Sequence, residues 1–317
     1  MKVVFMGTSE FAVASLDAIV QAGHEVAAVV TVPDKPAGRG QQLRFSDVKN
    51  YALEHQLAVL QPEKLKDPTF VETLRQLEAD VFVVVAFRML PEIVYAMPPK
   101  GTFNIHASLL PQYRGAAPIN WAVINGEKET GVTAFFLNRE IDKGDIIAQT
   151  KVAIGDEETA GELHDRLMVE GAALAIKTLA MIEKGSVTTL PQPQCDDDQL
   201  KPAPKIFRED MLINWNQPAR KIHDMIRGLS PYPAAYTRIQ DNKGEIFTIK
   251  CFQTAILAEK SNTPPGTITI DSRKKLLVST QDVQIQVQNI QFQGKKRMNS
   301  EIFLQGFRFE NYIMKLF

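Results

Sequence analysis

Short apolar segments alternate with amphipathic segments over the first 185 residues of the chain. Residues 2–6, 25–32 and 80–86 are apolar runs of strand length, and the third is rich in β-branched side chains. Residues 10–21 place Phe11, Leu16 and Ile19 at helical spacing, and Gly23 follows. Continuous apolar runs of this kind are typical of parallel strands that helices cover on both faces. The alternation predicts a doubly wound, Rossmann-like α/β domain.

The same pattern continues towards residue 185. Residues 102–106 and 131–137 are further strand candidates. Thr159 and Glu162 have the spacing of a capping box, and apolar residues then recur on one helical face until Gly185. We therefore expect a first domain over residues 1–185.

Residues 186–207 contain four prolines and three consecutive aspartates, and they predict an extended interdomain linker. Adjacent carboxylates without flanking ligands are more typical of a solvated turn than of a cation site. The pattern changes after the linker. Residues 217–228 predict a helix, and residues 245–251, 267–270 and 276–280 predict short strands.

The last predicted strand shows period-two alternation. Val283, Ile285 and Val287 alternate with glutamines, as in a half-buried antiparallel strand. We expect residues 208–317 to form a smaller β-barrel of about five strands, OB-like and of the kind that binds oligonucleotides.

The charge of the chain is unevenly distributed. Residues 1–207 hold 20 Lys and Arg against 27 Asp and Glu, whereas residues 208–317 hold 16 against 10. A basic last third favours a polyanionic partner, although a random surface imbalance is the alternative. Two basic clusters stand out, and each is as typical of a solvated turn as of a nucleic-acid contact: Arg273, Lys274 and Lys275, and then Lys295, Lys296 and Arg297.

Several functional classes are disfavoured. The chain has no run of ~18 apolar residues, so we expect no membrane partner. Cys195 and Cys251 form no C-x-x-C pair, which predicts no metal site and a reduced, cytoplasmic compartment. The first strand–helix turn offers only Gly7 of a G-x-G-x-x-G motif, which argues against NAD. Nothing in the sequence indicates an obligate protein partner.

Candidate chemistry is concentrated in residues 101–121. Asn104 and His106 are two residues apart on a predicted strand, so their side chains project from the same face, at the end where α/β sheets place ligands. Asp142 follows the next strand and is available to orient His106. The alternative is that Asn104 caps a turn, His106 packs in the core and Asp142 begins a tight turn. Spacing alone does not decide between these readings.

The motif N-I-H-A-S-L-L-P-Q-Y-R-G-A-A-P, followed by I-D-K-G-D, resembles the signature of the folate-dependent formyltransferases. The resemblance implies that Asn104, His106 and Asp142 are catalytic, that 10-formyltetrahydrofolate is the formyl donor and that no metal is needed. Asn104 and His106 would stabilise an oxyanion, His106 would also move a proton, and Asp142 would orient it. The residues implied in folate binding are Ser108, Leu109, Leu110 and Pro111, with Ala86, Phe87, Arg88, Met89 and Leu90 as the pterin wall.

Further features resemble the family members that act on methionyl initiator tRNA. They are the loop Pro-Asp-Lys-Pro-Ala-Gly-Arg-Gly at residues 33–40, and Ile-Asn-Trp, Pro-Tyr-Pro-Ala-Ala-Tyr and Gly-Lys-Lys at residues 213–215, 231–236 and 294–296. The resemblance implies a tRNA partner, with Lys35 and Arg39 of the loop and the two basic clusters as contacts. The alternatives are a sugar amine formyltransferase and a tRNA- or folate-binding module without turnover. The loop and the basic last third argue against the sugar enzyme.

Two positions depart from the family pattern. The pterin wall reads Ala-Phe-Arg-Met-Leu where most members have a Tyr-Gly pair, so we expect Phe87 and Arg88 to alter the pterin contacts. Asp47 stands where proline is usual.

Overall fold

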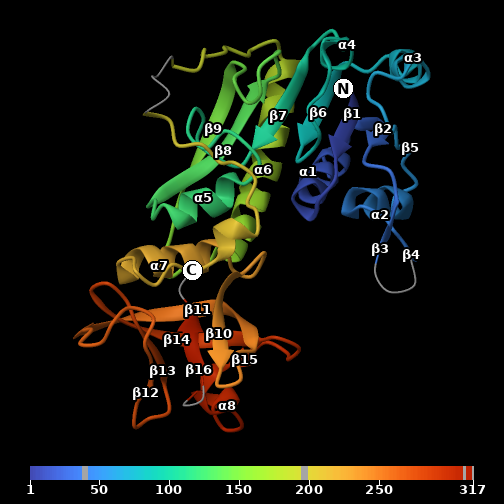
Figure 1. Ribbon diagram of the computed structural model, residues 1–317. Coiled ribbons are helices and arrows are strands. Elements are labelled where there is room, and N and C mark those ends of the chain that lie inside the picture. The colour runs from blue at the N-terminus through green and yellow to red at the C-terminus, as the bar shows by residue number, and fades with distance from the viewer. Residues whose placement is uncertain (38–41, 194–198, 310–311, 316–317) are drawn as a thin grey trace. The chain divides into compact units, whose positions relative to one another are not determined.

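The computed structural model describes residues 1–37, 42–193, 199–309 and 312–315 (Figure 1). The chain divides into two compact units, and each unit is made of three separate stretches. Unit 1 comprises residues 1–115, 129–153 and 164–202, and unit 2 comprises residues 116–128, 154–163 and 203–317. The stretches 116–128 and 154–163 lie within the predicted first domain but pack in unit 2. The domain boundaries at 185 and 208 stay a prediction.

A seven-stranded sheet forms the centre of unit 1, in the order β5-β2-β1-β6-β7-β8-β9. The first five strands are parallel, and β8 and β9 are antiparallel to their neighbours. The chain order reverses at β1, so the doubly wound, Rossmann-like fold is confirmed, with an antiparallel edge that the sequence pattern did not reveal. The strands are β1 (Lys2–Gly7), β2 (Glu25–Val30), β5 (Val59–Leu60), β6 (Val81–Val85), β7 (Thr102–His106), β8 (Glu129–Phe136) and β9 (Ile146–Ala153).

Amphipathic helices cover this sheet. On α3, Phe70 and Leu74 pack against Val4 and Phe82 of the central strands, which places one apolar core beneath the sheet. The predicted helix over residues 10–21 is present with the same bounds. The helices of this part of the chain are α1 (Glu10–Gln21), α2 (Asp47–Glu54), α3 (Pro68–Gln76), α4 (Glu92–Tyr95) and α6 (Ala160–Glu183). No helix in the described ranges has the length and apolar character needed to cross a membrane.

The predicted capping box begins α6. The Thr159 hydroxyl accepts from the backbone N–H of Glu162 at 3.3 Å, and the Glu162 carboxylate accepts from the backbone N–H of Thr159 at 2.8 Å. Each side chain therefore satisfies a backbone donor that the first helical turn leaves unpaired.

Unit 2 contains a curved antiparallel sheet in the order β12-β13-β14-β11-β10-β16, and a short β15 pairs with β14. Trp215, Ile249 and Ile285 are among the residues of its single apolar core. The smaller barrel-type domain is thus confirmed, with one strand more than expected in the main order. The strands are β10 (Ala235–Asp241), β11 (Ile246–Lys260), β12 (Ile268–Ile270), β13 (Leu276–Ser279), β14 (Val283–Phe292), β15 (Met298–Asn299) and β16 (Tyr312–Lys315).

One side chain on β14 departs from the predicted alternation. Ile285 and Val287 are buried as expected, but Gln286 is only 8% exposed. The reason is the central position of β14, because Gln286 pairs with Leu277 on β13 and with Ala255 on β11. The alternation indicated the strand correctly and the exposure of this glutamine wrongly.

Two helices of unit 2 approach each other closely. These are α5 (Pro118–Ile124) and α7 (Ala219–Gly228), and η2 (Glu209–Met211) and α8 (Ser300–Phe303) also lie in this unit. The Asn120 amide donates to the Gly228 carbonyl at 2.8 Å. A Cβ atom at Gly228 would lie 2.8 Å from the backbone nitrogen of Ile124, so only glycine permits this approach.

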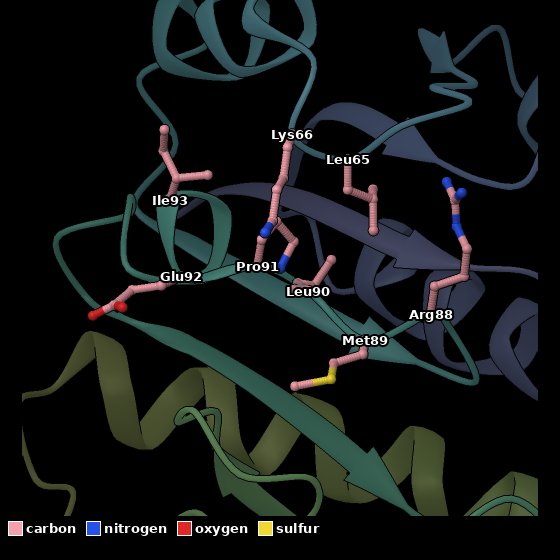
Figure 2. A pocket seen from close by; sticks show the side chains of 8 residues that line it. All are labelled: Leu65, Lys66, Arg88, Met89, Leu90, Pro91, Glu92 and Ile93. Carbon is pink, nitrogen blue, oxygen red and sulfur yellow. The ribbon is translucent and has the colours of Figure 1, made fainter.

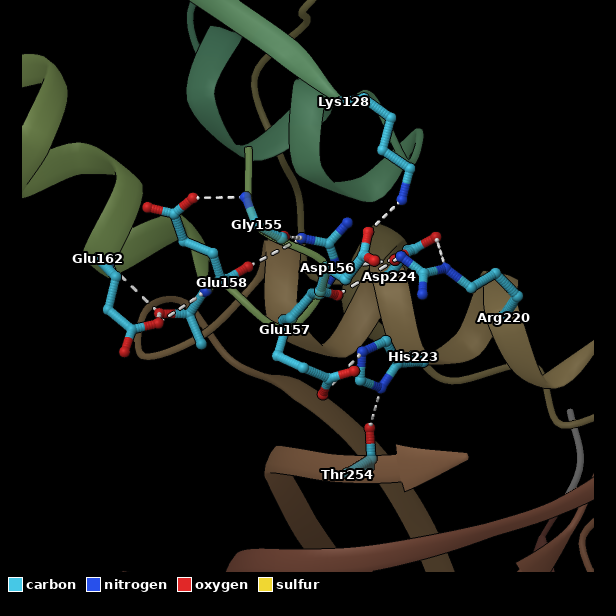
Figure 3. Close-up of polar contacts among 12 residues, drawn as sticks. Lys128, Gly155, Asp156, Glu157, Glu158, Glu162, Arg220, His223, Asp224 and Thr254 are labelled. Atoms are coloured by element: carbon cyan, nitrogen blue, oxygen red, sulfur yellow. Dashed lines mark hydrogen bonds and ion pairs between the residues drawn. The ribbon is translucent and has the colours of Figure 1, made fainter. Parts of the chain in front are cut away.

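A buried ion pair holds residues 154–163 on α7 (Figure 3). Arg227 is 3% exposed, and its Nε donates to Asp224 Oδ1 at 2.7 Å. A second guanidinium nitrogen donates to the carbonyl oxygens of Gly155, at 3.2 Å, and Glu158, at 2.9 Å. The charge of Arg227 is therefore satisfied by a carboxylate and by two backbone groups of the attached segment.

His223 lies beside this ion pair and is 2% exposed. Its Nδ1 is 3.0 Å from the Thr254 hydroxyl, and its Nε2 is 3.5 Å from a carboxylate oxygen of Glu157 (Figure 3). Burial lowers the pKa of His223, although the Glu157 and Asp224 carboxylates act in the opposite direction.

The described part of the predicted linker is extended and well bonded. Leu190 exchanges two backbone hydrogen bonds with Ile146, at 2.8 and 2.9 Å. The Gln192 amide donates to the carbonyl oxygens of Asp142, at 2.9 Å, and Gly144, at 2.8 Å. This stretch therefore supports the loop that carries Asp142.

Candidate active site

Two of the predicted site segments leave the sheet at the same edge. Strands β6 and β7 are parallel neighbours, with Val84 opposite Asn104 and Val85 opposite Ile105. The predicted pterin wall begins directly after β6, and the predicted catalytic strand ends at His106. The carboxyl edge of the sheet therefore brings these segments together, as expected for an α/β fold.

Asn104 has a buried amide oxygen that lacks a hydrogen-bond partner among the described residues. The residue itself is half-buried on β7, two positions before His106, so both side chains project from one face of the sheet. A buried acceptor without a donor is costly. A bound group with N–H hydrogens would supply the missing donor.

His106 is 6% exposed, and its ring has a defined orientation. Nε2 lies 2.9 Å from the carbonyl oxygen of Tyr113. A carbonyl oxygen only accepts, so Nε2 carries a hydrogen and donates it. In the neutral ring Nδ1 is then the unprotonated nitrogen, and it lies 4.0 Å from Asp142 Oδ2.

The Asp142 carboxylate is held in place by its surroundings. Asp142 follows β8, and its φ of +54° is a left-handed conformation. Its Oδ2 accepts from the backbone N–H of Gly115 at 3.0 Å, and its carbonyl oxygen accepts from Arg114 Nε at 3.1 Å and from the Gln192 amide. The sequence motif contained Arg114, but no local signal identified Gln192.

The segment Ser108–Pro111 is fixed by two side chains of the antiparallel edge. The Thr133 hydroxyl donates to the Ser108 carbonyl at 2.6 Å and accepts from the backbone N–H of Leu110 at 3.2 Å. Gln149 donates to Thr133 at 2.9 Å and to the Leu110 carbonyl at 3.0 Å. Ser108 is buried, and Leu109 is half-buried. Sequence reasoning missed Thr133 and Gln149, which lie on β8 and β9.

A cavity of about 650 Å³ lies beside the predicted pterin wall (Figure 2). Three of the five predicted wall residues, Arg88, Met89 and Leu90, line it, whereas Ala86 and Phe87 do not. Its other lining residues are Leu65, Lys66, Pro91, Glu92 and Ile93. The walls are mainly apolar, and the charged residues that line the cavity are Lys66, Arg88 and Glu92.

The Arg88 side chain is bonded to the backbone of a neighbouring segment. Its guanidinium donates to the carbonyl oxygens of Pro62, at 2.8 Å, and Glu63, at 3.1 Å. Burial lowers the pKa of Arg88. The side chain thus ties the wall segment to the chain before α3.

The predicted tRNA contacts lie in three places. Lys35 is exposed on β3 (Lys35–Ala37), which pairs with β4 (Gln42–Arg44), whereas Arg39 lies outside the described residues. Arg273 and Lys274 are exposed and Lys275 is half-buried in the β12–β13 turn, and Lys295, Lys296 and Arg297 are exposed in the β14–β15 turn.

The strand pairings of unit 2 show where the two basic turns lie along β14. Leu276 pairs with Val287, and Met298 pairs with Ile290, so both turns lie towards the carboxyl-terminal end of β14. Arg297 is engaged locally, because its Nε donates to Asn289 at 2.6 Å and its guanidinium lies 4.2 Å from the centre of the Phe252 ring.

No group of three or more His, Cys, Asp or Glu side chains suited to a metal ion occurs in the described ranges. Cys251 is buried in the core of unit 2, and burial raises the pKa of its thiol to about 12.

Two relatives match almost the whole chain. A methionyl-tRNA formyltransferase from Bacteroides fragilis is 50% identical over 308 residues, which cover 97% of this chain and 95% of the relative. The methionyl-tRNA formyltransferase of Azobacteroides pseudotrichonymphae is 52% identical over 313 residues, which cover 96% of this chain and 95% of the relative. Identity at this level over both units shows a common family.

A solved structure shows the same fold. A sugar 3N-formyl transferase, WlaRD, crystallised with dTDP and 5-N-formyl-THF, superimposes with a TM-score of 0.65 at 22% identity and covers 93% of this chain and 99% of its own. The formyl transferase family model matches residues 1–179, and the model of the formyl transferase C-terminal domain matches residues 205–308. The chain therefore belongs to the formyl transferase family, and it is a transferase.

Proposed function

We propose that this protein transfers the formyl group of 10-formyltetrahydrofolate to the amino group of methionine esterified to initiator tRNA. The observation that supports the chemistry best is the placement of Asn104 and His106 on one face of β7, with the Asp142 carboxylate 4.0 Å from the His106 ring. The acceptor is proposed from the near-full-length relatives, which are named as methionyl-tRNA formyltransferases.

The proposed reaction needs an oxyanion donor and a proton carrier. Attack of the amine on the formyl carbon forms a C–N bond, moves an electron pair onto the formyl oxygen and leaves a positive charge on the amine nitrogen. The Asn104 amide donates to this oxyanion, and its buried oxygen accepts an N–H of the amine. Both halves of one amide then contact the reacting groups.

His106 Nδ1 takes the proton of the amine, because Nε2 already carries the hydrogen given to Tyr113. The resulting imidazolium faces Asp142, whose negative charge stabilises it. Cleavage of the bond between the formyl carbon and N10 then requires a proton on N10, and His106 returns it. As this bond breaks, its electron pair leaves with N10, and the electron pair of the oxyanion re-forms the formyl C=O bond.

The proposed folate site is the edge of the sheet between residues 86–90 and Ser108–Pro111. The cavity beside Met89 and Leu90 has mainly apolar walls, as a p-aminobenzoyl group requires, and Lys66 offers a cation to the glutamate carboxylates of a folate. The residues proposed to contact folate remain those of the sequence motif, to which the cavity adds Lys66.

The sugar amine acceptor is the second candidate. The sugar formyl transferase shares 22% of its residues with this chain, and that likeness supports the fold and not the acceptor. The basic turns of unit 2 favour a polyanionic acceptor over a sugar amine. We also propose that the enzyme works in the cytoplasm and needs no obligate protein partner.

A formyl-transfer assay tests the proposal. Purified protein is mixed with 10-formyltetrahydrofolate and with charged initiator tRNA, uncharged tRNA or a nucleotide-linked amino sugar. We expect formylmethionine only on the charged tRNA. Formylation of the amino sugar alone would identify the other acceptor, and tRNA binding without product would identify a binding module.

A further inference from the structure

The predicted linker is hydrogen-bonded to both loops that position the proposed catalytic groups. Its residues 190–193 lie along the loop that contains Asp142, and its residues 199–202 lie along the loop that contains Tyr113. All of these residues belong to unit 1. The linker therefore does more than connect two domains, because it contacts the candidate active site at two points.

The first contact holds the backbone of Asp142. The Gln192 amide donates to the carbonyl oxygens of Asp142, at 2.9 Å, and Gly144, at 2.8 Å. Gln192 Oε1 accepts from Arg114 Nε, at 3.2 Å, and Nη2, at 2.5 Å. Because Arg114 Nε also donates to the Asp142 carbonyl, at 3.1 Å, the three residues form a closed ring of hydrogen bonds, and all three are half-buried.

The second contact holds Tyr113, whose carbonyl oxygen accepts from His106 Nε2. The backbone N–H of Tyr113 donates to the Lys201 carbonyl at 2.7 Å. The Gln112 side chain holds the linker at this point, because its Oε1 accepts from the backbone N–H of Lys201 at 2.8 Å and its Nε2 donates to the Gln199 carbonyl at 3.1 Å. The orientation of the His106 ring therefore depends on this part of the linker.

Asp142 and Tyr113 share a backbone conformation that needs such support. Their φ angles of +54° and +60° lie in the left-handed region, which is unfavourable for a residue with a side chain. Strained residues persist where the surrounding contacts hold them. The linker makes a hydrogen bond with the backbone of each one.

We propose that the linker supports catalysis at both points, with Gln192 as a positioning residue for Asp142 and Gln112 as a positioning residue for His106. Gln112 acts through the Lys201 and Tyr113 backbones. The inference rests on the proposed function, because it assigns both roles within the formyl transfer. Each residue acts on kcat through the catalytic group that it positions, and substrate affinity does not depend on it.

Steady-state formylation of charged tRNA tests the role of Gln192. Gln192→Glu keeps the size of the side chain and still accepts from Arg114, but a carboxylate cannot donate to the two carbonyl oxygens. Because a misplaced catalytic group can cost about 10²-fold in rate, kcat should fall by that order, while KM for charged tRNA and the Kd for folate stay at wild-type values. A wild-type kcat would overturn the assignment of Gln192.

Gln240→Glu is the matched control. The Gln240 amide also donates to a backbone carbonyl, that of Gly244 at 2.8 Å, but it lies in the β10–β11 turn of unit 2. This variant should keep the wild-type kcat. An equal fall in kcat in both variants would mean that the Gln192 result is not specific to the site.

A double-mutant cycle separates positioning from general stability. In the Asp142→Asn background the charge that Gln192 positions is absent, so Gln192→Glu should cause almost no further fall in kcat. If the two losses multiply instead, Gln192 acts through the fold and not through Asp142, which would overturn its assignment.

The tautomer of His106 tests the role of Gln112 without turnover. Nitrogen NMR spectra of isotope-labelled histidine in alkaline buffer should show the wild-type ring protonated on Nε2. Gln112→Leu should add the form protonated on Nδ1 and lower kcat, whereas Gln192→Glu should leave the tautomer unchanged. A wild-type tautomer in Gln112→Leu would overturn the assignment of Gln112.

The two proposals fail in different ways. If the wild type does not formylate charged tRNA, the proposed function is wrong, and the His106 tautomer still tests the contact with the linker. If the wild type is active and Gln192→Glu and Gln112→Leu match it, only the positioning roles are wrong.

Discussion

His106 Nδ1 and Asp142 Oδ2 lie 4.0 Å apart, which is too far for a hydrogen bond. The carboxylate is restrained at this distance, because the backbone N–H of Gly115 donates to the same oxygen. The hydrogen bond that orients the His106 ring is therefore the one to the Tyr113 carbonyl, and the proposed effect of Asp142 on the ring is that of its charge.

This relationship predicts the effect of Asp142→Asn. The amide keeps the shape of the carboxylate but removes the charge that stabilises a protonated His106, so kcat should fall by about 10²–10⁴-fold. Single-turnover formylation of charged tRNA measures this loss. Asp145→Asn is the control, since Asp145 is an exposed carboxylate three residues later. A wild-type kcat in Asp142→Asn would exclude the charge effect.

Asn104→Ala tests the oxyanion donor. Removal of one such donor typically lowers kcat by ~10²–10³-fold. Folding should be preserved, because the Asn104 amide oxygen has no hydrogen bond to lose among the described residues. Circular dichroism and the folate Kd check the fold. Turnover near that of the wild type would mean that the amide is structural only.

The lowered pKa of His223 predicts that the free energy of unfolding falls in acid. Burial lowers its pKa in the folded state, so the unfolded state binds the proton more tightly. The stabilisation is complete above the unfolded pKa of about 6.5 and falls as the pH drops below it, by at most about 1.4 kcal/mol per pH unit. Burial is the largest cause of the shift; Glu157 and Asp224 raise the pKa of His223, and Arg220 and Arg227 lower it.

Urea unfolding at pH 7.5 and pH 5.5 measures this effect. The difference in unfolding free energy between the two pH values should be smaller in His223→Gln than in the wild type. An equal difference in both proteins would assign the acid sensitivity to other groups.

Arg227 and Lys128 provide a comparison between a buried and an exposed ion pair. Arg227→Met leaves Asp224 buried with Arg220 as its one cationic partner among the described residues, so unfolding free energy should fall by about 3–5 kcal/mol. Lys128→Met breaks a pair with Asp156 in which both side chains are mostly exposed, and its effect on unfolding free energy should be much smaller because solvent screens the pair. Equal losses in the two variants would contradict the role of burial.

The basic side chains of the β14–β15 turn are expected to strengthen tRNA binding by their charge. Lys295 and Lys296 are exposed, so Lys295→Glu/Lys296→Glu should weaken tRNA binding and flatten its salt dependence. Lys243→Glu, in the β10–β11 turn, is the control for a charge change elsewhere in unit 2. An unchanged salt slope in the double variant would exclude this turn as a phosphate contact.

Local patterns predicted the elements that position the site. The helix over residues 10–21 and the strand over residues 102–106 have the predicted bounds, because their periodicity and flanking glycines are local signals. The spacing of Asn104 and His106 also predicted that their side chains project from the same face of the strand. What spacing left open was whether Asp142 comes near them.

The remaining features depend on contacts between distant parts of the chain. Gln192 donates a hydrogen bond to Asp142 from 50 residues away, and Gln61 donates one to Asp34 from 27 residues away. Polar residues such as these occur in any exposed loop, and no local pattern marks their partners. The antiparallel direction of β8 is likewise set by the path of the chain and not by its apolar run.

The interleaving of the two units has a consequence for synthesis. The chain crosses between the units five times, and residues 116–128 and 154–163 pack with a unit whose remaining residues begin at 203. Proteins generally fold from the amino terminus as they leave the ribosome. Here α5 and the segment before α6 leave the ribosome long before α7, which holds them through Asn120 and Arg227. These two segments therefore lack their packing partner until residues 203–317 have been synthesised.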